Sequence, residues 1–337
     1  NLESQTYKNF KLIVCVNQPD IWWDDSSKID ICEQNIKSID LINKLASDNN
    51  INCTIIDKTS KGKGWQGKNI GVGWARKTIM DHIALSASDE DIIVSLDADT
   101  YFKHNYFAVI HNHFANNPQI ETISGSAISF RYRALKKIGG FSPKKSGEDF
   151  YFIQKMIKYK PIGNWLEEKV YPAARFSDRV SFGTGPAMIK GNAGNWESYP
   201  LYPIALFDKI KAFFDLIPQL YTNNIDTPID AFWKDKDSKD TVFEKLRKNN
   251  KDLQHFTKAV HDYFDGLRTL QFLKANYNTD NEEANLIEFL NTDFANKIDA
   301  RLLINFSFND SSLGQLDAVR DFMVDLEDKY RKQISNS

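Results

Sequence analysis

The first half of the chain alternates between short apolar runs and stretches in which apolar residues recur at helical spacing. The short runs are typical of buried strands and cover residues 10–16, 52–56 and 91–96, with a further extended segment over 121–130. Helical spacing covers residues 31–46, 71–85 and 106–114. Strands that alternate with helices predict an α/β domain with a mostly parallel central sheet covered on both faces.

The pattern changes after about residue 190. A stretch rich in Gly, Asn and Pro leads into long segments with apolar stripes at helical spacing, such as residues 254–273 and 313–334. A chain of 337 residues is long enough for two domains. We therefore expect an α/β domain over residues 1–190 and an α-helical domain or extension over residues 191–337.

Composition and charge narrow the class of protein. The net charge of −2, with acids and bases interspersed, gives no electrostatic case for a nucleic-acid partner. No apolar run approaches the ~20 residues that span a bilayer, and no signal peptide is visible. The 3 cysteines form no CxxC pair, which argues against a disulfide framework and a zinc site. We expect a cytoplasmic protein, free or peripheral at the inner membrane face.

Two aspartates directly follow the apolar run over residues 91–96. Asp97 and Asp99 are one residue apart at the carboxyl end of this expected strand, where α/β sheets bind ligands. Two carboxylates at this spacing can hold Mg²⁺ or Mn²⁺ together with substrate phosphates. The structural alternative is a pair of acids that caps the following turn. The DxD pattern alone is a weak indication of a metal site, because it recurs at residues 89 and 91 and at residues 235 and 237.

A second acidic cluster follows two glycine-containing segments. Gly139 and Gly140 allow a tight turn and close approach of a ligand to the backbone. Glu148 and Asp149 open an expected helix, where acids are stabilised by the exposed amides and the helix dipole. A capped helix start explains this pattern in structural terms. The functional reading is that one of these carboxylates is a general base toward an acceptor hydroxyl.

A third feature is the basic, glycine-rich stretch over residues 61–77, KGKGWQGKNIGVGWARK. It runs into the start of an expected helix, which is a natural anion site. It has neither P-loop spacing nor the dinucleotide-binding fingerprint. The stretch therefore suits a diphosphate, and a plain exposed loop is the alternative.

Taken in this order, the clusters resemble the inverting family 2 glycosyltransferases of the GT-A fold, bacterial type. The resemblance lies in ESQTYKNFKLIVCV, GVGWARKTIMDHIA, SLDADT, GSAISFRYRALKKIGGF and GEDFYF, and runs from about residue 3 to about residue 190. It implies a GT-A-type nucleotide-binding domain, followed by a helical region that matches no pattern of the family.

The resemblance also implies roles for the acidic residues. Asp99 would be the principal metal ligand, and Asp97 would lie near the ribose or the waters of the metal. Asp149 would be the catalytic base, with Glu148 as its neighbour on the acceptor side.

Further roles follow for residues that bind the substrates. Arg76 would contact the nucleotide, while Gly125 and Ser126 would line the sugar-acceptor cleft. By analogy, Arg175 or Arg179 would close over the diphosphate; a surface arginine is the plain alternative.

The sequence departs from the family at two places. The family begins with a strand and a helix ahead of QTYKNF, and these are absent here. The acid that follows the family's second strand is replaced by Val16, Asn17 and Gln18. We expect Asn17 to hydrogen-bond the nucleotide base, although an Asn after a strand is also a common turn former.

The sequence thus predicts a glycosyltransferase that moves a sugar from a UDP- or GDP-sugar to a carbohydrate or lipid-linked acceptor in bacterial polysaccharide or glycoconjugate biosynthesis. Mn²⁺ or Mg²⁺ would be the cofactor, and inversion follows from the resemblance alone.

Two alternative functions stay open. A nucleotidyltransferase would need a basic glycine-rich loop right after the first strand, and a non-catalytic scaffold would bind a sugar or a partner through its helical half.

Overall fold

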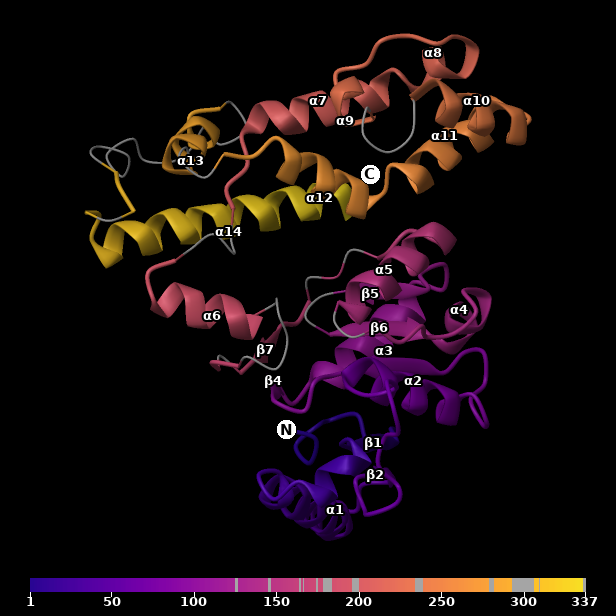
Figure 1. The fold of residues 1–337 in the computed structure, drawn as a ribbon, viewed down its shortest axis with the longest axis vertical. Coiled ribbons are helices and arrows are strands. Elements are labelled where there is room, and N and C mark those ends of the chain that lie inside the picture. The colour runs from indigo at the N-terminus through magenta and orange to yellow at the C-terminus, as the bar shows by residue number, and fades with distance from the viewer. Residues whose placement is uncertain are drawn as a thin grey trace. The chain divides into compact units, whose positions relative to one another are not determined.

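The computed structural model divides into two compact units, Asn1–Ile189 and Lys190–Ser337 (Figure 1). It describes residues 1–124, 127–144, 147–163, 165, 167–173, 175–177, 184–195, 200–233, 239–278, 282–292, 306–308 and 310–335. The division lies beside the boundary expected at residue 190, and helix α6 (Thr184–Asn192) runs across it.

The first unit opens with a pair of parallel strands. Strand β1 (Leu12–Asn17) pairs in parallel with β2 (Cys53–Lys58), and the crossover between them contains the 3₁₀ helix η1 (Asp20–Asp24) and helix α1 (Ile29–Asp48). A parallel pair needs such a crossover, because a tight turn reverses the chain direction. Helix α2 (Val72–Ile83) packs against β1.

A separate antiparallel sheet forms the middle of this unit. Strand β6 (Ile128–Arg131) lies between β3 (Ile92–Ser95) and β5 (Thr122–Ser124) and runs antiparallel to both. The segment 121–130, expected to be one extended run, is therefore two strands of a hairpin. Gly125 and Ser126, which were expected to line the sugar-acceptor cleft, lie outside the described residues.

The expected mixed α/β fold is confirmed, but a mostly parallel central sheet does not describe this unit. Among the described strands, β1 and β2 are the one parallel pair, and β1 is not hydrogen-bonded to β3. The reason lies in the hairpin, since it returns β6 alongside β3 in the opposite direction. Hydrophobic periodicity identifies a strand without giving its direction, so the pattern did not reveal this arrangement.

A third, two-stranded sheet follows the acidic loop. Strand β4 (Thr100–Phe102) pairs antiparallel with β7 (Val170–Pro172). Helices α3 (Tyr106–Asn116), α4 (Tyr132–Lys137) and α5 (Glu148–Tyr159) complete the described elements of the unit. Two apolar clusters hold it together, one around Phe130 and Phe152 and one around Tyr106 and Phe114.

The described elements of the second unit are all helices. They are α7 (Ile204–Asp215), α8 (Ile217–Thr222), α9 (Asp230–Trp233), α10 (Lys239–Asn249), α11 (Leu253–Tyr263), α12 (Gly266–Ala275), α13 (Glu282–Leu290) and α14 (Leu313–Ser335). The stripe over residues 254–273 spans two helices because Asp265 caps α12, accepting a hydrogen bond from the Arg268 amide at 3.2 Å.

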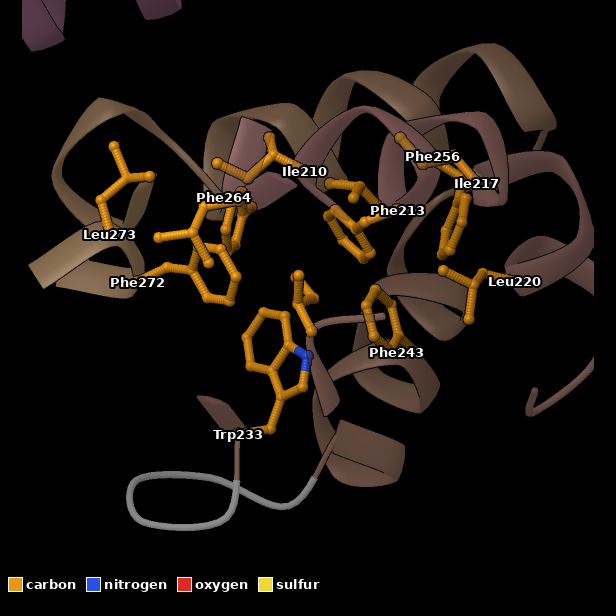
Figure 2. Packing of buried hydrophobic residues seen from close by; sticks show 13 residues of the cluster. Ile210, Phe213, Ile217, Leu220, Trp233, Phe243, Phe256, Phe264, Phe272 and Leu273 are labelled. Atoms are coloured by element: carbon orange, nitrogen blue, oxygen red, sulfur yellow. The ribbon is translucent and has the colours of Figure 1, made fainter. Parts of the chain in front are cut away.

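The core of this unit is aromatic. Phe213, Phe243, Phe256, Phe264 and Trp233 point into one cluster with aliphatic neighbours (Figure 2). Burial of each such side chain stabilises the fold by about 1.5–3 kcal/mol. Much of the chain's aromatic content therefore serves packing. Across the described part of the chain, we find no helix with the length and apolar character needed to cross a membrane.

Candidate functional site

Arg76, in the basic glycine-rich stretch, contacts an acidic residue from each of the other two motifs. Its Nη2 donates to Asp97 Oδ1 at 2.6 Å, and its Nη1 donates to Glu148 Oε1 at 2.9 Å. Asp97 stands after β3, Glu148 opens α5, and Arg76 lies in the second turn of α2. The fold thus brings together residues that are 21 and 72 positions from Arg76 in the sequence.

The two partners of Arg76 differ in their exposure to solvent. The side chain of Glu148 is 7% exposed, whereas that of Asp97 is 58% exposed. A buried carboxylate without a partner costs several kcal/mol, so Glu148 depends on Arg76 for its charge compensation. The planar guanidinium can serve both acids at once, which a lysine ammonium does less well. Arg76 therefore fixes the buried acid and leaves the other open to solvent.

Close packing against a glycine places α2 beside the segment that precedes α5. A Cβ atom added at Gly73 would meet the backbone of Lys144, lying 2.8 Å from its nitrogen and closer still to its carbonyl oxygen. Gly71, the residue before α2, adopts a φ of 96°, which favours glycine. The two glycines of GVGWARK thus allow the approach that aligns Arg76 with Glu148.

Asp99 has an arginine partner of its own. Arg175 Nη2 lies 2.8 Å from Asp99 Oδ2. The Asp99 carbonyl also accepts a hydrogen bond from the Ala173 amide at 3.2 Å, which ties the acidic loop to the segment after β7. Of the two arginines expected to close over the diphosphate, Arg175 lies at the acidic loop and Arg179 lies outside the described residues.

The donor set at Asp97 and Asp99 can be compared with the needs of a metal ion. Within the described ranges, no group of 3 or more His, Cys, Asp or Glu side chains is arranged to hold a metal. Mg²⁺ and Mn²⁺ are often bound by one or two carboxylates together with waters and substrate phosphates. Among the described residues the two aspartates are not part of an all-protein metal cage, so a metal here would need waters or substrate phosphates as further ligands.

Asp149 is placed differently from Glu148. It is exposed, and its Oδ1 accepts a hydrogen bond from the Phe150 amide at 2.8 Å. The structure gives it no ion pair with Arg76, so the described contacts join Glu148, and not Asp149, to the acidic loop. Gly147, with a φ of 67°, precedes the pair in a left-handed conformation.

Asn17 lies at the carboxyl end of β1, next to an indole ring. Its Oδ1 accepts a hydrogen bond from Trp65 Nε1 at 3.1 Å, and Lys58 Nζ lies 5.4 Å from the centroid of the Trp65 ring. Trp65 is also tied to the strand end through its amide, which donates to the Gln18 carbonyl at 2.9 Å. Sequence reasoning missed Trp65, because an isolated tryptophan in a glycine-rich stretch carries no positional signal.

A buried polar network behind these residues was missed as well. Gln18 Oε1 accepts hydrogen bonds from Thr59 Oγ1 at 2.6 Å and from Asn35 Nδ2 at 2.7 Å. Trp23 Nε1 donates to the Thr59 carbonyl at 2.7 Å. Buried polar groups with satisfied partners rigidify their surroundings. The network fixes the ends of β1 and β2, where Asn17 is presented.

Several cations of the basic stretch are paired with nearby acids. Lys63 Nζ contacts Asp57 at 2.9 Å, and Lys77 Nζ contacts Asp81 at 2.7 Å. Burial alone would raise the pKa of Asp57, but hydrogen bonds from Ser60, Thr59 and Lys63 outweigh it and hold the pKa well below its usual range. These lysines balance local acids, whereas Arg76 is the cation of this stretch that reaches the acidic loop.

Comparisons with known proteins give no relative for this chain. A scan against models of protein families matches none of them, a search of curated proteins finds no match, and a search of solved structures finds none either.

Proposed function

We propose that the chain is a glycosyltransferase that moves a sugar from a nucleoside diphosphate to an acceptor hydroxyl. One observation carries the proposal: Arg76 contacts both Asp97 of the DxD loop and Glu148 of the second acidic cluster. The motifs that resemble family 2 glycosyltransferases in sequence are thus neighbours in space. A sugar-nucleotide site needs such a cluster, with a cation for phosphate beside carboxylates for a metal and a proton.

The acidic loop would hold the donor's diphosphate. Asp99 and Asp97 would bind Mn²⁺ or Mg²⁺ together with the phosphates, and the metal, when bound, would offset the charge that develops on the diphosphate leaving group. Arg76 and Arg175 already lie on these carboxylates. Arg76 and Arg175 would contact phosphate oxygens of the donor, for which their planar guanidiniums are suited, and Arg76 would keep its Nη1 on Glu148.

The exposed carboxylate of Asp149 suits the general base better than that of Glu148. A base needs an oxygen free to accept a proton within reach of the acceptor hydroxyl. Glu148 is buried and its Oε1 is engaged by Arg76, whereas Asp149 is open to solvent. In the proposed step, Asp149 takes the hydroxyl proton, the acceptor oxygen bonds to the anomeric carbon, and the bond from that carbon to the diphosphate breaks with its electron pair leaving on phosphate. Inversion at that carbon rests on the resemblance.

The nucleoside would lie toward the carboxyl ends of β1 and β2. Ligands of α/β sheets bind beyond these strand ends. Asn17 offers an amide there, and Trp65 offers a ring with Lys58 on it. The Asn17 oxygen accepts from Trp65, and its Nδ2 donates to the Cys15 carbonyl at 3.4 Å, so the second amide hydrogen would be the group directed toward a base carbonyl. The proposed donor is a UDP- or GDP-sugar.

The acceptor would be a carbohydrate or a lipid-linked glycan, used in the cytoplasm or at the inner membrane face.

A direct test is incubation of the purified chain with radiolabelled UDP- and GDP-sugars and Mn²⁺, with release of the free sugar or its transfer as the readout. Cleavage of one donor that stops in Asp149→Asn supports the proposal. No cleavage of any donor, with no nucleotide binding, favours the non-catalytic scaffold.

A further inference from the structure

The β4–β7 sheet carries an exposed aromatic pair directly beside the acidic loop. Tyr101 and Tyr171 are cross-strand partners in this sheet, and their ring centroids are 6.1 Å apart. Figure 1 shows the two strands side by side. Tyr101 is 57% exposed and Tyr171 is 48% exposed, whereas the next residue of β4, Phe102, is 5% exposed. One face of the sheet therefore packs on the core, and the other presents two tyrosine rings to solvent.

A third exposed ring stands next to the same loop. Phe176 is 59% exposed and directly follows Arg175, the partner of Asp99. The Asp99 carbonyl extends the hydrogen bonding of β4 and β7 by accepting from Ala173. Single exposed aromatics are common on protein surfaces, but a group of them attached to an acidic site indicates a ligand surface.

From this juxtaposition we infer that Tyr101 and Tyr171 form an acceptor subsite that binds a pyranose ring of an oligosaccharide. A pyranose has an apolar C–H face and a rim of hydroxyls. Aromatic faces match the C–H side. The acceptor role of the bound sugar rests on the proposed function; the binding of sugar by the rings does not.

The structural alternative is that the tyrosine pair only stabilises the sheet, since cross-strand aromatic pairs do so by about 0.2–1 kcal/mol. Tyr101→Val separates the two roles, because valine favours strands while removing the ring. Tyr101→Phe keeps the ring. Phe207→Leu is the matched control, since Phe207 is an exposed aromatic of α7 in the other unit.

The experiment is ligand-observed NMR of the full chain with maltohexaose, cellohexaose, chitohexaose and an apolar peptide as separate probes. We expect at least one hexasaccharide to bind, with affinity reduced about tenfold or more in Tyr101→Val and in Tyr171→Val but retained in Tyr101→Phe and Phe207→Leu. Thermal unfolding of each variant verifies that the fold is kept.

Two results overturn the inference. One is that no hexasaccharide binds the unaltered chain, and the other is that binding is unchanged in both valine variants. Binding of the peptide alone would assign the rings to a protein partner and also overturn it. Nucleotide binding, measured separately, tests the proposed function, so a chain that binds sugar on these rings but no nucleotide would retain the subsite and lose the transferase.

Discussion

Arg76 Nη1 lies 2.9 Å from Glu148 Oε1, and this ion pair joins helix α2 to the first turn of helix α5. Because Glu148 is almost fully buried, the pair stabilises the packing of α5 against α2. The same guanidinium reaches the exposed Asp97 at 2.6 Å. One side chain thus sets the geometry of a site whose parts come from three separate segments.

Arg76→Met should destabilise the fold and remove nucleotide binding. The buried Glu148 carboxylate would lose its compensating charge, which costs roughly 3 kcal/mol. Urea unfolding measures the stability, and calorimetric titration with nucleotide and Mn²⁺ measures the binding.

A matched control for this variant is Arg133→Met. Arg133 donates to Glu121, whose side chain is 4% exposed, at 2.9 Å. Lys160 Nζ also lies 3.3 Å from Glu121 Oε1, so the loss of Arg133 should destabilise the fold somewhat less than the loss of Arg76. It should leave nucleotide affinity unchanged in the folded protein. If both variants lose binding equally, Arg76 acts through stability alone and its role toward the nucleotide is wrong.

Asp149→Asn should abolish sugar transfer and leave nucleotide affinity within about twofold, because the change removes a proton acceptor and keeps the shape. Its exposed position predicts a stability change within about 0.5 kcal/mol. Donor cleavage and calorimetry measure the two effects. Glu148→Gln is the comparison, since it should lower stability. Normal turnover by Asp149→Asn would reject this residue as the base.

The sequence anticipated most of the element positions in the first unit, because apolar runs and helical stripes report burial directly. The sequence did not predict the sheet pairing. The β5–β6 hairpin makes β6 the partner of β3, and hydrophobic periodicity does not indicate which strands pair. The β4–β7 sheet was missed because each strand is 3 residues long, too short for a pattern.

The sequence motifs predicted the site residues Arg76, Asp97, Asp99, Glu148 and Asp149. In the structure, Arg76 contacts both Asp97 and Glu148. Arg175 forms an ion pair with Asp99. Residue spacing could not show which member of the Glu148–Asp149 pair is buried, because that depends on how α5 docks. The hydrogen bond between Trp65 and Asn17 was not predicted either, because the two residues are 48 positions apart in the sequence and only the tertiary fold brings them together.

Gly73→Ala should destabilise the first unit by about 1–3 kcal/mol, as overpacking does in tight interfaces. The added methyl group would collide with the Lys144 backbone, and backbone cannot move aside as a flexible side chain does. Gly314→Ala, in the first turn of α14, has its nearest neighbour at 3.9 Å and should be neutral or slightly stabilising. Thermal unfolding compares the two; equal stability would contradict the close packing of α2.

The thiol of Cys15 gives the fold a pH dependence. Burial raises its pKa from 9.0 to about 11. A raised pKa in the folded state favours the neutral thiol, so its contribution is complete below the unfolded pKa and is lost as pH rises through the folded value. The stability difference between the unaltered chain and Cys15→Ala should be constant well below pH 9.0 and fall as the pH rises toward 11. A difference that stays flat over this range would contradict the buried thiol.

Asp97 and Asp99 are proposed to form a donor site for a metal and a nucleotide. Calorimetric titration of the full chain with UDP and GDP, each with and without Mn²⁺, tests it most directly. We predict that one nucleotide binds in a Mn²⁺-dependent manner. Asp99→Asn should remove this binding, and Asp89→Asn, a matched exposed aspartate paired with Lys136, should retain it. If neither nucleotide binds, or if binding is the same without Mn²⁺ and in Asp99→Asn, the proposed donor site is wrong.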